Sequence, residues 1–502
     1  MASKLKAHQH HSSTPKSPPY PDTLKYEADI EHSEPTAANG VLEALGYEPE
    51  LERNRSTLQV AFMSFVLAAI PYGLATTFYY PLVGGGPVNI IWGWVIVSAI
   101  ILCVGASLGE ITSVYPTAGG VYYQSFMLSP PAYRRIVAWI CGWSYVVGNI
   151  MITLAVNFGS AQFIIACVNV FEVSPGTFAI FWTFAGVLAI IVCVLAIAKN
   201  GRRSGEYVFA DFEPQSGWPV GWSFCVGLLQ AAYTTSSTGM VISMCEEVQE
   251  PSRQVPKAIV GTIILNFVAG LLFLIPLVFI LPDTTMLIGL ASGQPIPTII
   301  KSAVGNTTGA FLLLLPLCVL ALLCGIGCTT AVSRSVWAFA RDGGIPWSNL
   351  WRVVDKRLNV PLNAMMLGMG IEIALGLIYF GSTTAFNAFS GVGVITLTVS
   401  YACPIAVSFI RGRKQIQNGN FNLGKLGIFC NVVAVSWSIL AVPLFCMPAA
   451  IPVTAETVNY APVVFVGFTV IAMVWYWVWG KKRYDGPPSV EDLAIHLRHD
   501  GS

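Results

Sequence analysis

Two apolar segments of this 502-residue chain are each interrupted by residues that apolar helices normally avoid. Residues 70–77 read Ile-Pro-Tyr-Gly-Leu-Ala-Thr-Thr, and residues 233–239 read Tyr-Thr-Thr-Ser-Ser-Thr-Gly. Because proline lacks a backbone donor and glycine loosens the backbone, each segment can break a helix in its middle. If the segments cross a membrane, such breaks are tolerated only where they face protein or a wet cavity. Freed carbonyls attract cations and half-helix N-termini attract anionic groups, so the pair predicts a binding site for a small charged substrate.

The candidate substrate-binding residues come from both interrupted segments and from a polar position on a third apolar segment. They are Ile70, Pro71, Tyr72, Gly73, Tyr233, Thr234, Thr235, Ser236, Ser237, Gly239 and Asn149. The alternative is that the small and hydroxylated residues only let helices pack closely. We favour the site because one such segment opens each half of the chain. Asn149 and Asn157, eight residues apart, either line the cavity or form hydrogen bonds between helices.

Two carboxyl groups in apolar surroundings are candidates for coupling transport to a proton. Glu110 closes the second apolar segment, and Glu372 lies inside a later one. A carboxylate at the bilayer centre costs at least about 2.5 kcal/mol, so it usually faces the bundle interior or a partner. For Glu110 the alternatives are an ion pair with a loop arginine or proton transfer. For Glu372 they are a protonatable coupling group or a neutral, hydrogen-bonded acid.

The composition excludes a soluble protein. Only 11% of the residues are charged, 27 Lys and Arg against 26 Asp and Glu, and 54% are hydrophobic. Fifteen of the 53 charges lie in the first 55 residues, which leaves 38 for the remaining 447. Soluble proteins carry about 25% charged residues. The chain is therefore an integral protein of the lipid bilayer, and its near-zero net charge argues against binding nucleic acid.

No signature of an enzyme or of a bound cofactor is found. The chain lacks a Walker P-loop, an HExxH motif and a GxSxG motif. His8, His10 and His11 could hold a metal, but no cysteine or carboxylate partner lies near them, so no metal site is predicted. The twelve cysteines are scattered through apolar runs and indicate small buried residues with free thiols. We therefore expect no enzyme, no cofactor and no metal.

An all-α membrane protein with eleven apparent spans is predicted, because each crossing needs about 20 mostly apolar residues. The candidate spans are 57–81, 88–109, 136–170, 177–198, 218–243, 258–281, 309–333, 362–380, 388–410, 427–449 and 460–480. Residues 1–55 are rich in Pro, Ser, His, Lys and Glu and predict a disordered cytoplasmic tail. Residues 56–480 form the polytopic domain, and 481–502 a cytoplasmic C-terminal tail.

The basic loops conflict with this span count. The positive-inside rule places loops rich in Lys and Arg in the cytoplasm. With eleven alternating spans and a cytoplasmic first tail, the 110–135 loop lies inside, but every basic loop after residue 243 lies outside. One additional crossing between residues 135 and 250 corrects all of them. Either a span is missing there or 136–170 crosses twice; at 1.5 Å per residue, that segment is about 52 Å long.

Five stretches resemble amino acid–polyamine–organocation (APC) permeases: Glu110–Tyr123 is similar to the loop after the second span of these permeases, and the other four resemble the fungal branch that carries GABA, other amino acids and choline. The five stretches are Leu45–Leu51, Gly84–Pro87, Glu110–Tyr123, Glu246–Pro256 and Thr330–Gly343. The resemblance covers about residues 42–488. It implies twelve helices in a LeuT-like fold of five plus five inverted repeats and two extra helices, with broken helices at 69–77 and 233–240. It also implies uptake of a small amino-group or ammonium compound, usually driven by the proton gradient.

The chain departs from the family pattern in two places. Residues 169–172 run almost directly into 177–186, which resembles the family's fifth helix, so we expect the family's fourth helix to be absent. With four spans before residue 218, the two halves would run parallel rather than inverted. Many relatives also carry an acid and a histidine where this chain has Gly239 and Ser243, so its substrate is expected to differ from GABA.

Three functions remain open. The first is a secondary transporter of amino acids, GABA or related amines, with the proton as coupling ion, in the plasma membrane or alternatively the vacuolar membrane. The second is a carrier of choline or another quaternary ammonium compound, which requires an aromatic cage. The candidate rings are Tyr72, Phe78, Tyr79, Tyr145 and Tyr233. The third is a non-transporting nutrient receptor or inactive remnant, suggested by the missing helix.

Overall fold

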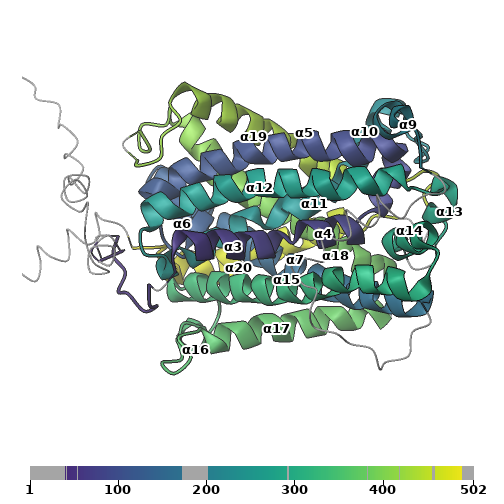
Figure 1. Cartoon of the computed structure of the whole chain (residues 1–502). Helices are drawn as coiled ribbons and strands as arrows, with labels where there is room; N and C mark the ends of the chain where they lie inside the picture. The colour runs from purple at the N-terminus through teal and green to yellow at the C-terminus, as the bar shows by residue number, and fades with distance from the viewer. Residues whose placement is uncertain are drawn as a thin grey trace, which may run out of the picture.

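A computed structural model gives the arrangement of most of the chain. It describes residues 40–171, 202–290, 293–380, 383–454 and 458–488, apart from residues 41, 44, 54 and 418. Figure 1 shows long helices lying side by side along one direction. Within the described ranges the secondary structure is helical apart from two isolated bridges, Arg55 to Val248 and Asp355 to Val360. The predicted all-α fold is confirmed.

The helices follow one another in the order of the predicted spans, with short helices between them. In chain order they are α3 (Thr57–Ala68), α4 (Ile70–Thr76), α5 (Tyr79–Val114), α6 (Gly120–Leu128), α7 (Arg134–Phe171), α9 (Gly205–Ala210), α10 (Val220–Gly227), α11 (Leu229–Thr235), η2 (Ser236–Glu247), α12 (Pro251–Phe279), α13 (Thr284–Ile288), α14 (Pro295–Val304), α15 (Thr307–Arg341), α16 (Ser348–Trp351), α17 (Leu362–Gly376), η3 (Leu377–Phe380), α18 (Thr383–Ile410), α19 (Lys425–Phe445), α20 (Ala461–Trp475), η4 (Tyr476–Gly480) and α21 (Lys481–Arg483).

Nine helical stretches in the described part of the chain are long and apolar enough to cross a membrane. They correspond to nine of the eleven predicted spans. The predicted span 218–243 is built from α10, α11 and η2, each shorter than 18 residues, because the helix is broken. The predicted span 177–198, and with it the question of a missing fourth helix, lies outside the described residues.

Helix α7 excludes one of the two explanations offered for the conflict between the span count and the basic loops. It runs without interruption from Arg134 to Phe171, 38 residues, so the idea that this segment crosses twice is wrong. The helix contains no proline that would break it. Its glycines admit close neighbours: a Cβ at Gly142 would lie 2.5 Å from the ring of Phe339, and one at Gly148 would lie 2.8 Å from Leu397.

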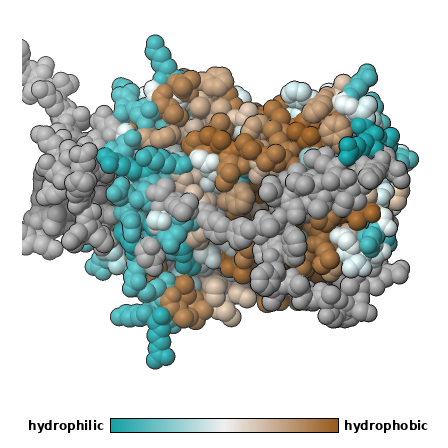
Figure 2. Space-filling view, viewed as in Figure 1, coloured by the Kyte–Doolittle hydropathy of each residue, from teal (hydrophilic) through white to brown (hydrophobic). Residues whose placement is uncertain are grey.

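The basic loops gather at one end of the bundle, which we call the basic end; α6 and α16 mark it on the left of Figure 1. Ion pairs join its parts: Arg413 to Glu110 at the end of α5, and Arg341 of α15 to Glu246 of η2. Figure 2 shows hydrophilic residues across this end and hydrophobic surface beyond them. The basic residues here are Arg134, Arg135, Arg253, Lys257, Arg334, Arg341, Arg352, Lys356, Arg357, Arg411, Arg413, Lys414, Lys425, Lys481, Lys482 and Arg483.

The two interrupted segments run antiparallel. The start of α3 lies beside the end of η2, where Arg55 forms a bridge with Val248. The end of α4 lies beside the start of α11, where the Gln230 side chain donates to the Leu74 carbonyl at 2.8 Å. The expectation of parallel halves is therefore wrong.

The antiparallel orientation follows from the end of the bundle at which α7 finishes and the end at which the described chain resumes. Helix α7 starts at the basic end and finishes at the opposite end. The described chain resumes at residue 202 near that same end, because the Arg203 N–H donates to the carbonyl of Phe279, the last residue of α12. Helices α10, α11 and η2 then return to the basic end, whereas α3 and α4 leave it.

The outer face of the bundle is apolar. Large side chains are exposed along α12, α17, α19 and α20, for example Leu265, Ile373, Ile439 and Ile471. In water such a surface would be unfavourable, whereas lipid tails accept it. The chain is a multi-pass membrane protein.

Candidate substrate-binding site

The first break lies at Ala69, two residues before Pro71. Helix α3 ends at Ala68, Ala69 adopts the left-handed conformation with φ 39° and ψ 51°, and α4 begins at Ile70. Pro71 sits in the first turn of α4, where its missing N–H needs no partner. A non-glycine residue in the left-handed region costs roughly 1–2 kcal/mol. The predicted interruption is confirmed, and surrounding contacts must hold it.

The second break is a change of helix type. Helix α11 ends at Thr235, and the backbone continues from Ser236 to Glu247 as the tighter 3₁₀ helix η2. Hydroxyl groups follow the same change: Thr234 donates to the carbonyl four residues back, at 2.8 Å, whereas Ser236 and Thr238 donate to carbonyls three residues back, at 2.7 Å. These hydroxyl groups donate to backbone carbonyls of the preceding turn, as Ser and Thr side chains commonly do. This interruption is also confirmed.

The two breaks are in contact. A Cβ at Gly73 would lie 2.8 Å from the Thr234 methyl carbon, so only glycine fits there without a shift. The Gln230 side chain, one turn before Thr234, donates to the Leu74 carbonyl at 2.8 Å. The structure thus brings the two predicted parts of the site together. All eleven candidate substrate-binding residues are buried.

Helix α7 forms the third side of this region. The Tyr145 hydroxyl donates to the Gly239 carbonyl at 3.4 Å, and the Asn149 amide donates to the Tyr145 carbonyl at 2.8 Å. The side-chain amide oxygen of Asn149 (Oδ1) and the Ser237 hydroxyl have no hydrogen-bond partner in the described part of the chain, although both are buried. Such groups normally have partners. They can accept hydrogen bonds from a polar guest.

Tyr72 is already engaged by α7. Its hydroxyl donates to the Val156 carbonyl at 2.9 Å, accepts from Ser160 at 3.0 Å, and its ring meets Phe163 edge-on. Among the other rings proposed for a cage, Tyr79 contacts Tyr80 and Tyr145 contacts Tyr401. The aromatic cage, which also included Phe78 and Tyr233, stays a prediction.

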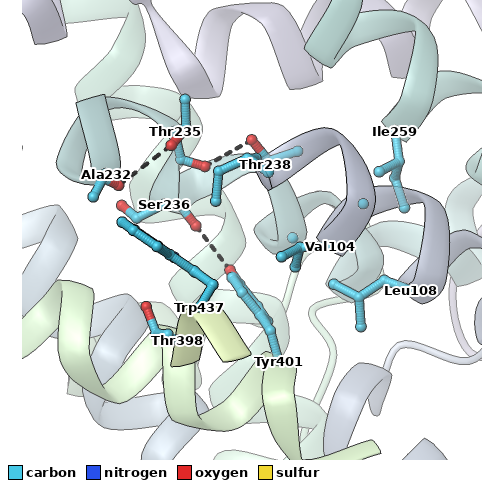
Figure 3. Close-up of a pocket in the computed structure, with 13 residues that line it drawn as sticks. Val104, Leu108, Ala232, Thr235, Ser236, Thr238, Ile259, Thr398, Tyr401 and Trp437 are labelled. Carbon is cyan, nitrogen blue, oxygen red and sulfur yellow. Dashed lines mark hydrogen bonds between the residues drawn. The ribbon is translucent and has the colours of Figure 1, made fainter. Parts of the chain in front are cut away.

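A small cavity of about 30 Å³ lies behind the second break (Figure 3). Thr235, Ser236 and Thr238 line one side, and Tyr401 and Trp437, from α18 and α19, line the other. The Tyr401 hydroxyl donates to the Ser236 carbonyl at 3.0 Å. The cavity has room for about one water molecule. The sequence analysis did not identify Tyr401 as a site residue. The one available signal was Gly239, because a glycine leaves space that a large side chain from another helix can fill.

A larger groove of about 380 Å³ lies between α7, α15 and α17. Asn157, on its wall, donates to a Glu372 carboxyl oxygen at 3.2 Å, so the predicted hydrogen bond between helices is confirmed for this asparagine. The second Glu372 oxygen is buried without a partner in the described residues. A neutral acid and a proton-coupling group both fit this geometry.

Glu110 forms the ion pair that was predicted as one alternative. Its carboxylate accepts from Arg413 at 2.6 Å and 2.7 Å, and from the Leu423 N–H at 2.7 Å. The Glu110 side chain is 1% exposed and that of Arg413 9%. This pair ties the loop after α18 to the end of α5.

A second group of buried charges lies at the basic end, where η2 finishes. Glu247 pairs with Arg55 at 2.5 Å and with Arg334 at 2.7 Å. Glu246 accepts two hydrogen bonds from Arg341, at 2.8 and 3.0 Å. We call these five residues the charge cluster. The sequence signal was present in the acidic pair that ends η2 and in two arginines seven residues apart, on one face of α15.

Asp342 lies beside the charge cluster. It accepts hydrogen bonds from Tyr47 at 2.9 Å and Tyr122 at 2.8 Å. Burial raises the pKa of Asp342 to about 6, against the opposing effect of the Arg341 guanidinium. Burial and the Asp342 carboxylate raise the pKa of Tyr47 well above its usual value. The segment before α3 is thereby fastened to the end of α15.

No group of three His, Cys, Asp or Glu side chains comes together to hold a metal ion within the described ranges. His8, His10 and His11 lie outside those ranges. The described cysteines are free.

A membrane bundle in which two antiparallel helices are broken at contacting positions has the architecture of secondary transporters. The chain belongs to the amino acid permease family, whose model matches residues 163–468. It is 30% identical to a choline transporter of Saccharomyces cerevisiae, over 92% of this chain and 87% of that protein. It is 31% identical to the GABA-specific permease of the same yeast, over 89% and 85%. Amino-acid permease BAT1 of Arabidopsis thaliana is 30% identical, over 89% and 96%. The predicted resemblance to APC permeases is confirmed.

Proposed function

We propose that this chain is a secondary active transporter that binds an amino acid or small amine between the two breaks. The observation that carries the proposal is the contact between the antiparallel breaks at Gly73 and Thr234, together with two buried acceptors, Asn149 Oδ1 and the Ser237 hydroxyl, that have no donor among the described residues. An ammonium group offers hydrogen-bond donors and no acceptor. It is the group that such acceptors favour.

The proposal includes coupling to the proton gradient. Glu372 is the preferred coupling residue, because its carboxyl group lies in mid-helix with one oxygen unpartnered in the described residues. Glu110 is a weaker candidate, since Arg413 already neutralises it. The positive-inside rule assigns the basic end to the cytoplasm, which places both tails there.

Uptake by the full chain tests the proposal. The protein is produced in cells that lack their own permeases, and uptake of labelled neutral amino acids, GABA, choline and a polyamine is measured at several external pH values. We expect saturable uptake of at least one compound that increases as external pH falls. Asn149→Ala should raise KM for a substrate with a primary ammonium group by about tenfold, the effect of one buried hydrogen bond. Absence of uptake of every compound would refute transport and favour the receptor or remnant.

A quaternary ammonium substrate is the second candidate, supported by the similarity to a choline transporter. A trimethylammonium group donates no hydrogen bond and relies on aromatic faces instead. If choline is the substrate, Tyr233→Ala should abolish its uptake, whereas Asn149→Ala should leave the KM for choline within about twofold. The opposite pattern would exclude this candidate.

A further inference from the structure

Tyr401 occupies the space in which residue 239 would carry a side chain. A Cβ placed on Gly239 would lie 2.5 Å from Cζ, 2.6 Å from Cε1 and 2.9 Å from the hydroxyl oxygen of Tyr401. Such distances are far below van der Waals contact, so the ring and a side chain at position 239 exclude each other. The two residues are 162 positions apart and lie on η2 and α18.

The Tyr401 hydroxyl also holds the backbone at the point where the helix changes type. It donates to the carbonyl of Ser236, the first residue of η2, at 3.0 Å. From another helix, α7, the Tyr145 hydroxyl donates to the carbonyl of Gly239 at 3.4 Å. The two rings meet at 6.3 Å. Two tyrosines thus hold the first turn of η2.

The surroundings keep the Tyr401 ring in place. Its side chain is buried, and the adjacent cavity of about 30 Å³, lined also by Thr398 and Trp437, is too small to accept the ring. The turn that the ring supports carries Ser236 and Ser237, both candidate substrate-binding residues. A change at position 401 should therefore reach the substrate through the backbone of η2.

We propose that Tyr401 is a positioning residue that fixes the second break and thereby determines how tightly, and in what size range, substrates bind. The inference rests on the proposed function. Its ring limits the space at Gly239, and its hydroxyl fixes the Ser236 carbonyl.

Three variants separate the ring from the hydroxyl. Tyr401→Phe keeps the ring and removes the hydrogen bond to a buried carbonyl; we expect about a tenfold rise in KM with little change in Vmax. Gly239→Ala places a methyl group against the ring and should reduce uptake at least about tenfold. A leucine at position 401 ends at its δ carbons, so the double variant Gly239→Ala with Tyr401→Leu removes all three clashing atoms and should restore uptake to the level of Tyr401→Leu alone.

The matched control is Tyr476→Phe, which removes the hydroxyl of another buried tyrosine, on η4, and should leave KM unchanged. KM, Vmax, the ranking of substrates by size, and the amount of protein in the membrane are measured for each variant. Tyr401→Leu should shift the ranking toward larger substrates. An unchanged KM and ranking in Tyr401→Phe and Tyr401→Leu, at normal abundance, would overturn the inference, as would failure of the double variant to recover. If wild type transports nothing, the proposed function itself fails and this inference falls with it.

Discussion

Neutralising Glu247 should open the basic end of the protein. The Glu247 carboxylate is 7% exposed and pairs with Arg55, from the segment before α3, and with Arg334 of α15. The change Glu247→Gln keeps the size of the side chain but removes its charge. Two guanidinium groups would then face a neutral amide in a buried position. The parts of the protein that they join must separate if the substrate site is to open toward this end.

The expected effect is large because both partners are shielded from water. The Arg334 side chain is 5% exposed and that of Arg55 20%. Removing one partner of a buried ion pair costs about 3–5 kcal/mol. We take the lower figure because Arg55 is partly exposed and can be hydrated. About 3 kcal/mol corresponds to a change of more than 100-fold in the ratio of open to closed basic end.

The thiol of Cys245 reports this opening. It is fully buried in η2, two residues before Glu247. The purified full chain in detergent is treated with a maleimide, and modified cysteines are identified by peptide mass spectrometry. In Glu247→Gln the rate of Cys245 modification should rise about 100-fold. Cys141, buried between α7 and α18, should stay unmodified, because the opening is local and not unfolding.

An exposed ion pair provides the control. Arg135 and Asp485 also lie at the basic end, but their side chains are 50% and 86% exposed. Such a pair contributes at most about 1 kcal/mol. Arg135→Gln should therefore change the Cys245 rate by no more than severalfold. If the maleimide modifies Cys245 no faster in Glu247→Gln than in Arg135→Gln, the charge cluster does not close this end and the reasoning is wrong.

Three further carboxyl variants test separate parts of the structure. Burial raises the pKa of the Asp342 carboxyl group to about 6, so between about pH 4 and 6 the folded protein retains a proton that the unfolded chain has released. The stability that this group contributes therefore falls as pH rises from about 4 to 6. Asp342→Asn should flatten the decline of Tm over this range. Glu110→Gln leaves Arg413 buried and unpaired, and should lower stability by about 3 kcal/mol in thermal unfolding; unchanged stability with lost pH dependence of uptake would instead support a coupling role. Glu372→Gln should abolish accumulation driven by a pH gradient but preserve exchange of substrate across the membrane, and normal accumulation would remove Glu372 as the coupling residue.

Local features of the fold were predictable from local residues. Hydropathy placed nine described spans, and Pro71 and the Ser/Thr run before Gly239 marked both interruptions, because backbone breaks depend on residues at the break itself. Pairings between distant residues were not predictable. Nothing around Tyr401 or Asn157 indicates their contacts with Gly239 and Glu372, which lie 162 and 215 positions away.

The orientation of the two halves shows how one local rule can correct another. Counting spans predicted parallel halves, whereas the distribution of Lys and Arg required one more crossing between residues 135 and 250. In the structure the basic loops share one end and the broken helices are antiparallel, as the charges required. Hydropathy reports each segment separately, but the side on which a loop lies depends on every preceding crossing. Loop charges therefore carry information on topology that span counting lacks.

The basic residues at this end divide into two groups with different physical consequences. Arg55, Arg334, Arg341 and Arg413 are paired with buried or nearly buried glutamates, so their charges are largely neutralised and contribute little to the field outside the protein. The exposed group consists of Arg135, Arg253, Lys257, Arg352, Lys356, Arg357, Arg411, Lys414, Lys425, Lys481, Lys482 and Arg483. All twelve lie at the basic end, so they still support the proposed cytoplasmic location of this end after the paired arginines are set aside. Replacing exposed bases should consequently affect insertion and leave the reactivity of Cys245 unchanged, whereas replacing paired ones should do the reverse. A chain with so few charges outside its first 55 residues thus uses one set to orient itself and another to hold its basic end closed.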